Sequence, residues 1–301
     1  MSTGARRRSP EQRALRESIA ASAALGVIAV VWGVVAQSRV LLFDGVFMVL
    51  GILLSGLSLL AAVAADAPPT RTFPFGKKAA TPLAIGVQGA ALLGTLAYAT
   101  VDAVTVIRGG GADVAPGTVL AYGLLSVLVS GLVIWRLGRL SDAELVTVER
   151  AQWRAGAWLS AVIAAGGATA WWLDGTRWNE AVPYADPVLV LVACALIAPV
   201  PFRLLRAAGL ELLEAAPPPA VRAQVADVVE AARARFDLPE PVVAATKLGG
   251  RLYLEVVFVV DGTWRVVDED AVRRAIIDPL EELGYELWAN VELTADADLA
   301  P

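Results

Sequence analysis

One apolar stretch, residues 40–65, constrains the fold of this chain most strongly because it contains a carboxylate. The stretch VLLFDGVFMVLGILLSGLSLLAAVAA is about as long as a helix must be to cross roughly 30 Å of hydrocarbon. Asp44 lies about one helical turn from its start. A carboxylate at membrane depth is costly and is rarely left facing lipid. Asp44 therefore either faces the interior of a helix bundle, as a binding or proton-carrying group, or lies at the membrane interface, where it caps the helix or snorkels.

Five further apolar stretches have the length of a membrane helix: residues 18–37, 82–107, 119–137, 151–172 and 187–205. Hydrophobic residues make up 57% of the 301 residues, whereas soluble globular proteins contain about 45–50% apolar residues. The intervening segments, such as DAPPTRTFPFGKK and RGGGADVAPG, contain the proline and glycine that end helices. The sequence therefore predicts six membrane-spanning helices.

Basic residues are concentrated in alternate loops. Those at the N-terminus, between spans two and three and between spans four and five are Arg6, Arg7, Arg8, Arg13, Arg16, Arg71, Lys77, Lys78, Arg139, Arg150 and Arg154. The opposite loops carry only Arg39, Arg108 and Arg177. Because basic loops stay on the cytoplasmic side, we expect both termini in the cytoplasm. We expect a multi-pass protein of the plasma membrane, with residues 1–16 as a cytoplasmic tail rather than a signal peptide.

From about residue 211 the composition becomes that of a soluble domain. Its segments are a helix near 216–236, strands at 241–248 and 251–260 joined by Gly249 and Gly250, a helix at 268–283 and a strand at 285–293. This order predicts a small α+β domain with a ferredoxin-like αββαβ arrangement. The predicted domains are thus the tail (1–16), an all-α membrane domain of six helices (17–210) and a cytoplasmic α+β domain (211–301). A domain this small often pairs with a second copy, which predicts a homodimer.

The composition also argues against several classes of function. The chain has no histidine and one cysteine, Cys194, so an intrachain disulfide cannot form. It contains no nucleophile–base pair, phosphate-binding glycine loop or cofactor motif, so we expect neither an enzyme nor a bound cofactor. The soluble domain is acidic, which argues against nucleic acid as a partner. The expected partners are the lipid bilayer, a second copy of the chain and a cation substrate.

Four segments, in this order, resemble motifs of the cation diffusion facilitator (cation efflux) family. They are SRVLLFDGVFMVLGILLS in span two, FPFGKKAATPLAIGVQG before span three, ERAQWRAGAWLSAVIAAG in span five and YADPVLVLVACALI in span six. The similarity extends from about residue 16 to residue 293. It implies six spans, cytoplasmic termini and a small cytoplasmic domain, with export of a cation as the expected activity.

The resemblance also implies a transport site of four side chains, two from span two and two from span five, around a divalent ion. The matching positions are Asp44, Met48, Gln152 and Gly156. Only Asp44 is the ligand type that the family leads one to expect; Met48 offers a thioether, Gln152 an amide and Gly156 no side chain. Glu149, about one turn before Gln152, is either a further ligand or a solvated group. Zinc sites in proteins use several thiolate, imidazole or carboxylate ligands, so this set does not fit zinc.

The departure from the family pattern leaves several interpretations open. Met48 is either a ligand for a soft cation such as Cu(I) or part of the apolar core. Gln152 either helps Asp44, backbone carbonyls and water to bind an oxygen-preferring cation or makes an interhelical hydrogen bond. We expect Asp186 to cap or orient the outer end of span six, and Asp102 to be an outer ligand or an interfacial group.

Two functions follow from these interpretations. The first is a membrane transporter that exports a cation from the cytoplasm by proton antiport, with Asp44 as its central carboxylate. The alternative is a relative of the family that has lost transport and acts as a dimeric membrane scaffold or modulator. We favour transport because an intramembrane carboxylate without a task is costly to keep.

Overall fold

The computed structural model describes residues 10–140 and 144–300, with side chains for residues 17–139, 150, 152–298 and 300. Residues 1–9 of the predicted tail therefore lie outside the described residues. The chain divides into two compact units, one formed by Met1–Gly56 and Ala91–Pro201 and the other by Leu57–Ala90 and Phe202–Pro301. Each unit is described in its own terms below.

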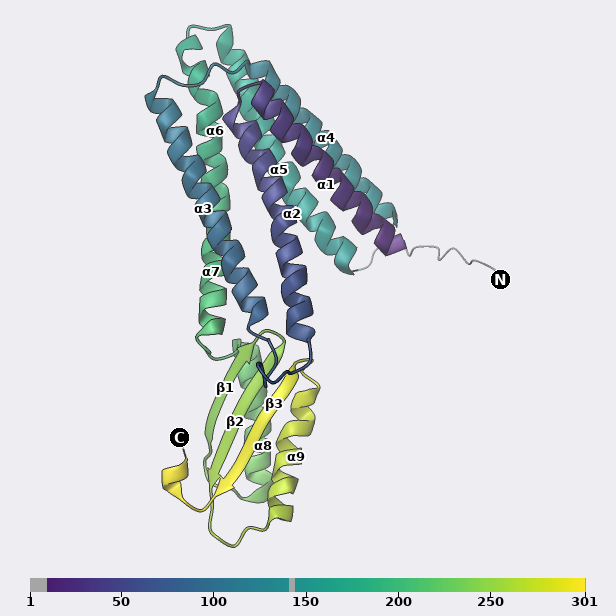
Figure 1. The fold of residues 1–301 in the computed structure, drawn as a ribbon, viewed down its shortest axis with the longest axis vertical. Helices are drawn as coiled ribbons and strands as arrows, with labels where there is room; N and C mark the ends of the chain where they lie inside the picture. The colour runs from purple at the N-terminus through teal and green to yellow at the C-terminus, as the bar shows by residue number, and fades with distance from the viewer. Residues whose placement is uncertain (1–9, 141–143, 301) are drawn as a thin grey trace, which may run out of the picture. The chain divides into compact units, whose positions relative to one another are not determined.

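The first two thirds of the chain are helical. The helices are α1 (Pro10–Val35), α2 (Arg39–Asp66), α3 (Ala80–Arg108), α4 (Pro116–Leu140), α5 (Glu144–Asp174), α6 (Val182–Ile197) and α7 (Pro199–Leu212), with a short 3-10 helix η1 (Asn179–Ala181) before α6 (Figure 1). In the described part of the chain, six segments are long and apolar enough to cross a membrane. Many of their large apolar side chains are exposed, as lipid-facing side chains would be. The prediction of six membrane-spanning helices is confirmed.

The sixth span begins earlier than the predicted residue 187. Helix α6 starts at Val182 and contains Pro187. Proline has no N–H and cannot bond to the carbonyl four residues earlier, which here belongs to Pro183. That carbonyl instead accepts the N–H of Ala112 at 2.7 Å. Because the loop before α4 supplies the missing donor, proline does not mark the start of this helix.

Two clusters of buried apolar side chains form the core of the first unit. The larger cluster joins α1, α2, α3, α4, α5 and α6 and includes Ala29, Leu41, Phe43, Leu96, Tyr122, Ile163 and Val190. The smaller cluster contains Leu25, Leu137 and Trp153, with Met48 and Val133 packed against it. The larger cluster includes Phe43, which directly precedes Asp44 in the sequence.

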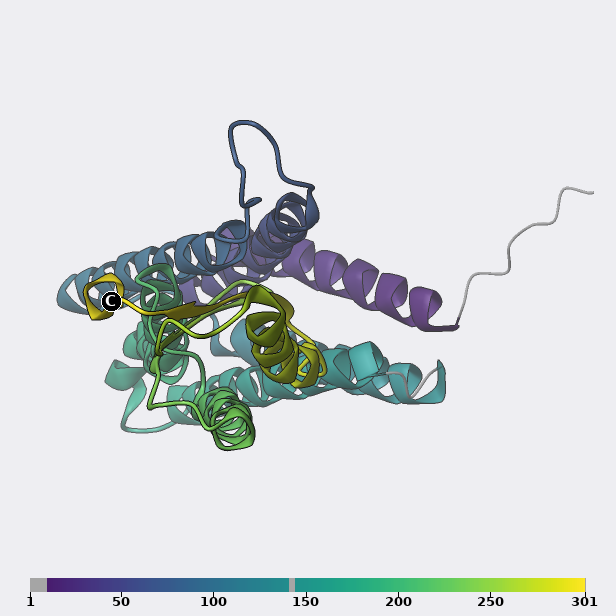
Figure 2. The same ribbon diagram turned by 90° about the horizontal axis from the view of Figure 1, so that it is seen from below.

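The C-terminal part is a three-stranded sheet covered by two helices. Its elements are α8 (Pro219–Phe236), β1 (Val242–Leu248), β2 (Arg251–Val259), α9 (Val266–Glu281), β3 (Glu286–Thr294) and the 3-10 helix η2 (Ala297–Leu299). Strand β2 lies in the centre, antiparallel to β1 and parallel to β3. Helices α8 and α9 lie on the same side of the sheet (Figure 2). The predicted order of helix, strand, strand, helix and strand is confirmed.

Alternate residues of β2 point toward the two helices and are buried there. They are Leu252, Leu254, Val256 and Phe258, which pack with Val225 and Val229 of α8 and with Val272 and Ile276 of α9. This two-residue period is the pattern of a strand with one covered face. The opposite face of the sheet carries polar and aromatic side chains such as Tyr253, Glu255, Trp288 and Asn290.

The loop between α2 and α3 is fastened to one end of this sheet, within the second unit. Arg251 donates a hydrogen bond from Nη1 to the carbonyl oxygen of Phe75 at 2.7 Å and also pairs with Glu286. Glu286 pairs with Lys78 at 2.5 Å, and the rings of Phe75 and Trp288 meet edge to face at 5.5 Å. We call these five residues the loop clamp. They attach a loop to strands that follow it by more than 170 residues in the sequence.

The turn between β1 and β2 requires glycine where it meets this loop. Gly249 has a φ of +60°, and a Cβ atom there would lie 2.6 Å from the carbonyl oxygen of Lys78. Its N–H donates to Glu211 at the end of α7, at 2.6 Å. The hairpin predicted from Gly249 and Gly250 therefore also brings the sheet close to both neighbouring segments.

Candidate functional site

The beginning of α2 is fixed by an aspartate from another helix. The Ser38 hydroxyl accepts the N–H of Leu41 at 3.3 Å, as an N-cap does, and donates to Asp186 of α6 at 2.5 Å. Asp186 also accepts the N–H of Arg39 at 2.7 Å. No side chain caps the start of α6 itself. Of the two roles expected for Asp186, capping its own span is wrong. Its carboxylate instead ties the start of α6 to the start of α2, which agrees with the orienting role.

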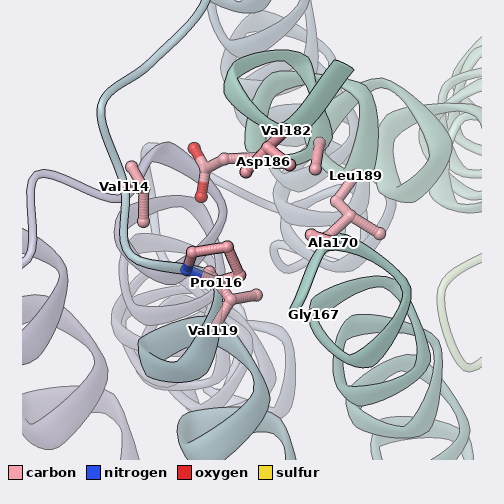
Figure 3. A pocket seen from close by; sticks show the side chains of 9 residues that line it. Val114, Pro116, Val119, Gly167, Ala170, Val182, Asp186 and Leu189 are labelled. Carbon is pink, nitrogen blue, oxygen red and sulfur yellow. The ribbon is translucent and has the colours of Figure 1, made fainter. Parts of the chain in front are cut away.

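A cavity of about 10 Å³ lies beside Asp186. Figure 3 shows its carboxylate among apolar residues that include Val114, Pro116 and Leu189. A space of this size holds about one water molecule. It is too small for a hydrated ion, so the Asp186 carboxylate is best explained as part of the structure of this helix junction.

Asp102 of α3 pairs with Arg39 at 3.4 Å, and both side chains are partly exposed. Exposed ion pairs of this kind contribute little to stability. The pair adds a contact between α2 and α3 near the start of α2.

Asp44 lies a little over one turn after the start of α2, and its residue is only 5% exposed. The hydroxyl of Tyr122 on α4 donates a hydrogen bond to its Oδ2 atom. Tyr122 is fully buried, and Trp32 of α1 packs edge-on against its ring at 6.2 Å. This burial agrees with a side chain that faces the interior of the helix bundle. A buried carboxylate with a single donor retains acceptor capacity, since a carboxylate can accept about four hydrogen bonds.

Both residues of this pair are followed by a glycine that permits close helix packing. A Cβ atom at Gly45 would lie 2.7 Å from the backbone nitrogen of Val30 on α1. A Cβ atom at Gly123 would lie 2.6 Å from the Cα atom of Ala164 on α5. Small residues allow helix backbones to approach closely in membranes. The sequence thus places Asp44 and Tyr122 where neighbouring helices cannot be separated by larger side chains.

A row of hydroxyl groups continues from Tyr122 to α5. Ser126 lies one turn along α4 from Tyr122 and interacts with its hydroxyl. The hydroxyls of Ser126 and Ser160 are 2.8 Å apart, and Ser160 can donate to the carbonyl of Gly156 at 3.0 Å. Both serines are buried. We call Tyr122, Ser126 and Ser160 the hydroxyl row.

The hydroxyl row could not be predicted from the sequence. Serine and tyrosine occur in many membrane helices without a functional role, and the sequence does not show which faces of α4 and α5 meet. The only available signal was the spacing of Tyr122 and Ser126, which puts them on one helix face.

The other residues implicated by the family resemblance lie elsewhere. Met48 packs against the cluster of Leu25, Leu137 and Trp153, which agrees with its interpretation as core. Gln152 is exposed, and none of the hydrogen bonds found among the described residues involves it. It is eight residues, or about 12 Å along α5, from Ser160. The structure therefore brings Asp44 to the hydroxyl row and not to Gln152.

Two further positions on α5 complete this comparison. Gly156 is exposed, and its carbonyl oxygen accepts the hydrogen bond from the Ser160 hydroxyl. Glu149 belongs to α5, but its side chain is not among those described. Within the described residues, no three or more His, Cys, Asp or Glu side chains are grouped to hold a metal ion. The side-chain groups found near Asp44 in the described part of the chain are the hydroxyls of Tyr122, Ser126 and Ser160.

Comparison with known proteins agrees with the resemblance inferred from the sequence. A family model described as the cation efflux transmembrane domain matches residues 15–213, well over half of the chain, and spans all six apolar segments. Comparison with curated proteins found no match. Members of the matched family are transporters, which confirms the expectation that the protein is not an enzyme. The chain therefore belongs to the cation efflux family.

Proposed function

We propose that the protein exports a cation from the cytoplasm in exchange for protons, and that Asp44 binds the ion. The observation that carries the proposal is the burial of this carboxylate in the helix bundle, where it is 5% exposed. A charge in such a place is costly unless a partner of opposite charge compensates it. The family of the chain, whose members move cations, supports a cation as that partner.

The same burial provides a reason for proton exchange. When the cation leaves, the carboxylate would remain as an uncompensated charge at membrane depth. Uptake of a proton removes that charge, so the two ions compete for one group. Tyr122 suits both states because a phenol can donate to a carboxylate and accept from a carboxylic acid. In this proposal Gln152 is a second ligand beside Asp44, and Met48 and Glu149 are weaker ones. The exposure of Gln152 and the apolar packing of Met48 support these two residues less than burial supports Asp44.

The proposal includes an arrangement in the membrane. Both termini and the α+β domain lie in the cytoplasm, an orientation that the alternation of basic loops supports. The protein is a homodimer of the plasma membrane in this proposal. The division into residues 1–16, 17–210 and 211–301 is part of the same proposal. A cysteine label at Gly76 should then react only from the cytoplasm, and one at Gly111 only from outside.

The main test is the variant Asp44→Asn in the full chain, reconstituted in liposomes. Asparagine keeps the shape but removes the charge, so cation flux driven by a proton gradient should fall to the level of empty liposomes. Asp102→Asn, which removes a carboxylate from a partly exposed ion pair, should transport as the parent does. Gln152→Ala should weaken transport less, because water can replace a neutral ligand.

Two results would contradict the proposal. Asp44→Asn transport equal to that of the parent would make the carboxylate structural. A parent chain that moves no cation, while forming a folded dimer, would favour the scaffold or modulator.

A further inference from the structure

We propose that the ion bound by Asp44 is a hard monovalent cation of the alkali-metal class rather than a divalent transition metal. The inference rests on the proposed function and names the substrate class of the same site. It follows from the donor atoms around Asp44, the number of charges there and the free acceptor capacity of the carboxylate.

The donor atoms near Asp44 are oxygens. They are the carboxylate itself and the hydroxyl row, which starts with the hydrogen bond from Tyr122 to Asp44 and continues to the pair of Ser126 and Ser160 at 2.8 Å. Transition metals such as zinc and copper prefer imidazole, thiolate or thioether ligands. Oxygen donors suit hard cations.

Among the described residues, no imidazole or thiolate ligand changes this preference. The chain has no histidine. Met48, one turn after Asp44, offers a single neutral thioether and is packed against an apolar cluster, so it adds neither a charge nor an oxygen donor. The thiol of Cys194 lies against the carbonyl oxygen of Leu96 at 3.8 Å. A soft ion at Asp44 would therefore lack its preferred ligands.

The charge at the site matches a monovalent ion. Among the described residues, Asp44 is the only carboxylate in contact with the hydroxyl row. Two other aspartates of these helices are used elsewhere: Asp186 holds the start of α2, and Asp102 pairs with Arg39. One carboxylate neutralises one positive charge, whereas a divalent ion would leave a net charge in a buried site, which is costly.

In this proposal an ion takes the place of the hydrogen bond between Tyr122 and Asp44, whose oxygens are in contact and separate to admit it. Asp44 accepts only the hydrogen bond from Tyr122 among those found in the described residues. The phenolic oxygen has lone pairs of its own. An ion between the two groups would thus be bound by the carboxylate and by the phenol, with the hydroxyls of Ser126 and Ser160 behind it. The close packing at Gly45 and Gly123 favours an ion that has shed much of its water.

The test compares ions on the full chain in liposomes, with a pH-sensitive dye inside and an imposed proton gradient. Na⁺ or K⁺ should dissipate the gradient. Zn²⁺ and Mn²⁺ at the same concentration should do so roughly tenfold more slowly or not at all. A tenfold difference in rate corresponds to a difference in binding free energy of about one hydrogen-bonded ligand. Exchange with Zn²⁺ or Mn²⁺ alone would overturn this inference and leave the proposed function intact. Exchange with none of the four ions would contradict the proposed function, and the inference with it.

Variants test the two arguments separately. Tyr122→Phe removes one oxygen ligand and should raise the KM for Na⁺ or K⁺ by about tenfold with a smaller change in kcat. Ser130→Ala is the matched control, because Ser130 is buried on α4 one turn beyond Ser126 and outside the hydroxyl row. If the KM of Tyr122→Phe for Na⁺ or K⁺ is unchanged, the phenolic oxygen is not a ligand, and the argument from the oxygen donors is wrong.

The charge argument predicts a gain of function. Met48→Asp adds a second carboxylate one turn from Asp44 and should shift the preference toward Mn²⁺ by roughly tenfold, since two carboxylates match a divalent ion. A folded Met48→Asp protein that keeps the preference for Na⁺ or K⁺ would contradict it. If this variant does not elute as a folded protein, the comparison of ions and Tyr122→Phe still decide the inference.

Discussion

The two units of the molecule use similar polar contacts in opposite surroundings. In the helix bundle, Asp44 and Asp186 are 5% and 3% exposed and are held by hydroxyl and backbone donors. In the loop clamp of the second unit, the side chain of Glu286 is 49% exposed and bonds to two cations. Both sets join segments far apart in the sequence. The bundle carboxylates are held by neutral donors because few charges can be buried there, whereas the clamp pairs full charges around the half-exposed carboxylate of Glu286.

This difference determines what the loss of each contact should cost. A buried group that loses its partner costs about 1–3 kcal/mol, since no water replaces that partner. An exposed ion pair contributes about 0–1 kcal/mol. Substitutions that remove one polar group from each unit therefore test whether burial, rather than charge, sets the energy of these contacts.

The largest effect should come from Asp186→Ala. This change leaves the Ser38 hydroxyl and the Arg39 N–H without their acceptor at the buried start of α2, and it should lower the free energy of unfolding by about 3 kcal/mol. Thermal unfolding in detergent measures it. Asp102→Asn, in a partly exposed pair, is the control and should cost less than about 1 kcal/mol. Equal effects of the two changes would show that burial does not distinguish these carboxylates.

A smaller effect is expected from Arg251→Met in the loop clamp. Methionine keeps much of the aliphatic volume but leaves the Phe75 carbonyl and Glu286 without the guanidinium, whose side chain is 5% exposed. The free energy of unfolding of the second unit should fall by about 1–2 kcal/mol. Arg265→Met, which breaks a pair whose arginine is 78% exposed, should change it by less than about 0.5 kcal/mol. If Arg251→Met is as stable as Arg265→Met, water fully replaces the hydrogen bonds that Arg251 makes.

The smallest effect is the pH dependence of the clamp. The Lys78 ammonium, and next the Arg251 guanidinium, hold the pKa of Glu286 below its usual range. A lowered pKa stabilises the fold above the usual glutamate value of about 4.3, and this contribution disappears as the pH falls through the folded-state pKa. The difference in Tm between the parent and Glu286→Gln should therefore shrink below about pH 4. A difference that stays constant into acid would show that the two cations do not act on this carboxylate.

Local patterns in the sequence were sufficient to predict the architecture. Hydropathy predicts membrane helices because each helix exposes its own apolar surface to lipid. The alternation in RLYLEVVFVV predicts β2 because successive side chains of a strand point to opposite faces. Asp44 could be recognised because a single carboxylate in an apolar stretch is conspicuous without any knowledge of its neighbours.

The partners of these residues depend on contacts that a local pattern does not contain. Ser38 and Asp186 are 148 residues apart, and Asp44 and Tyr122 are 78 residues apart. Family position suggested Gln152 as a partner of Asp44, but it is exposed. Which faces of the helices meet depends on packing features such as the glycines beside Asp44 and Tyr122, whose role is visible only in three dimensions.

The loop clamp has a consequence for how the α2–α3 connection can vary. Arg251 binds this loop through the main-chain oxygen of Phe75, and Gly249 is packed against the main-chain oxygen of Lys78. Every residue type carries such an oxygen, so substitutions in the loop keep these two contacts. An inserted or deleted residue would move both oxygens away from the sheet. The connection should consequently tolerate changes of composition far better than changes of length.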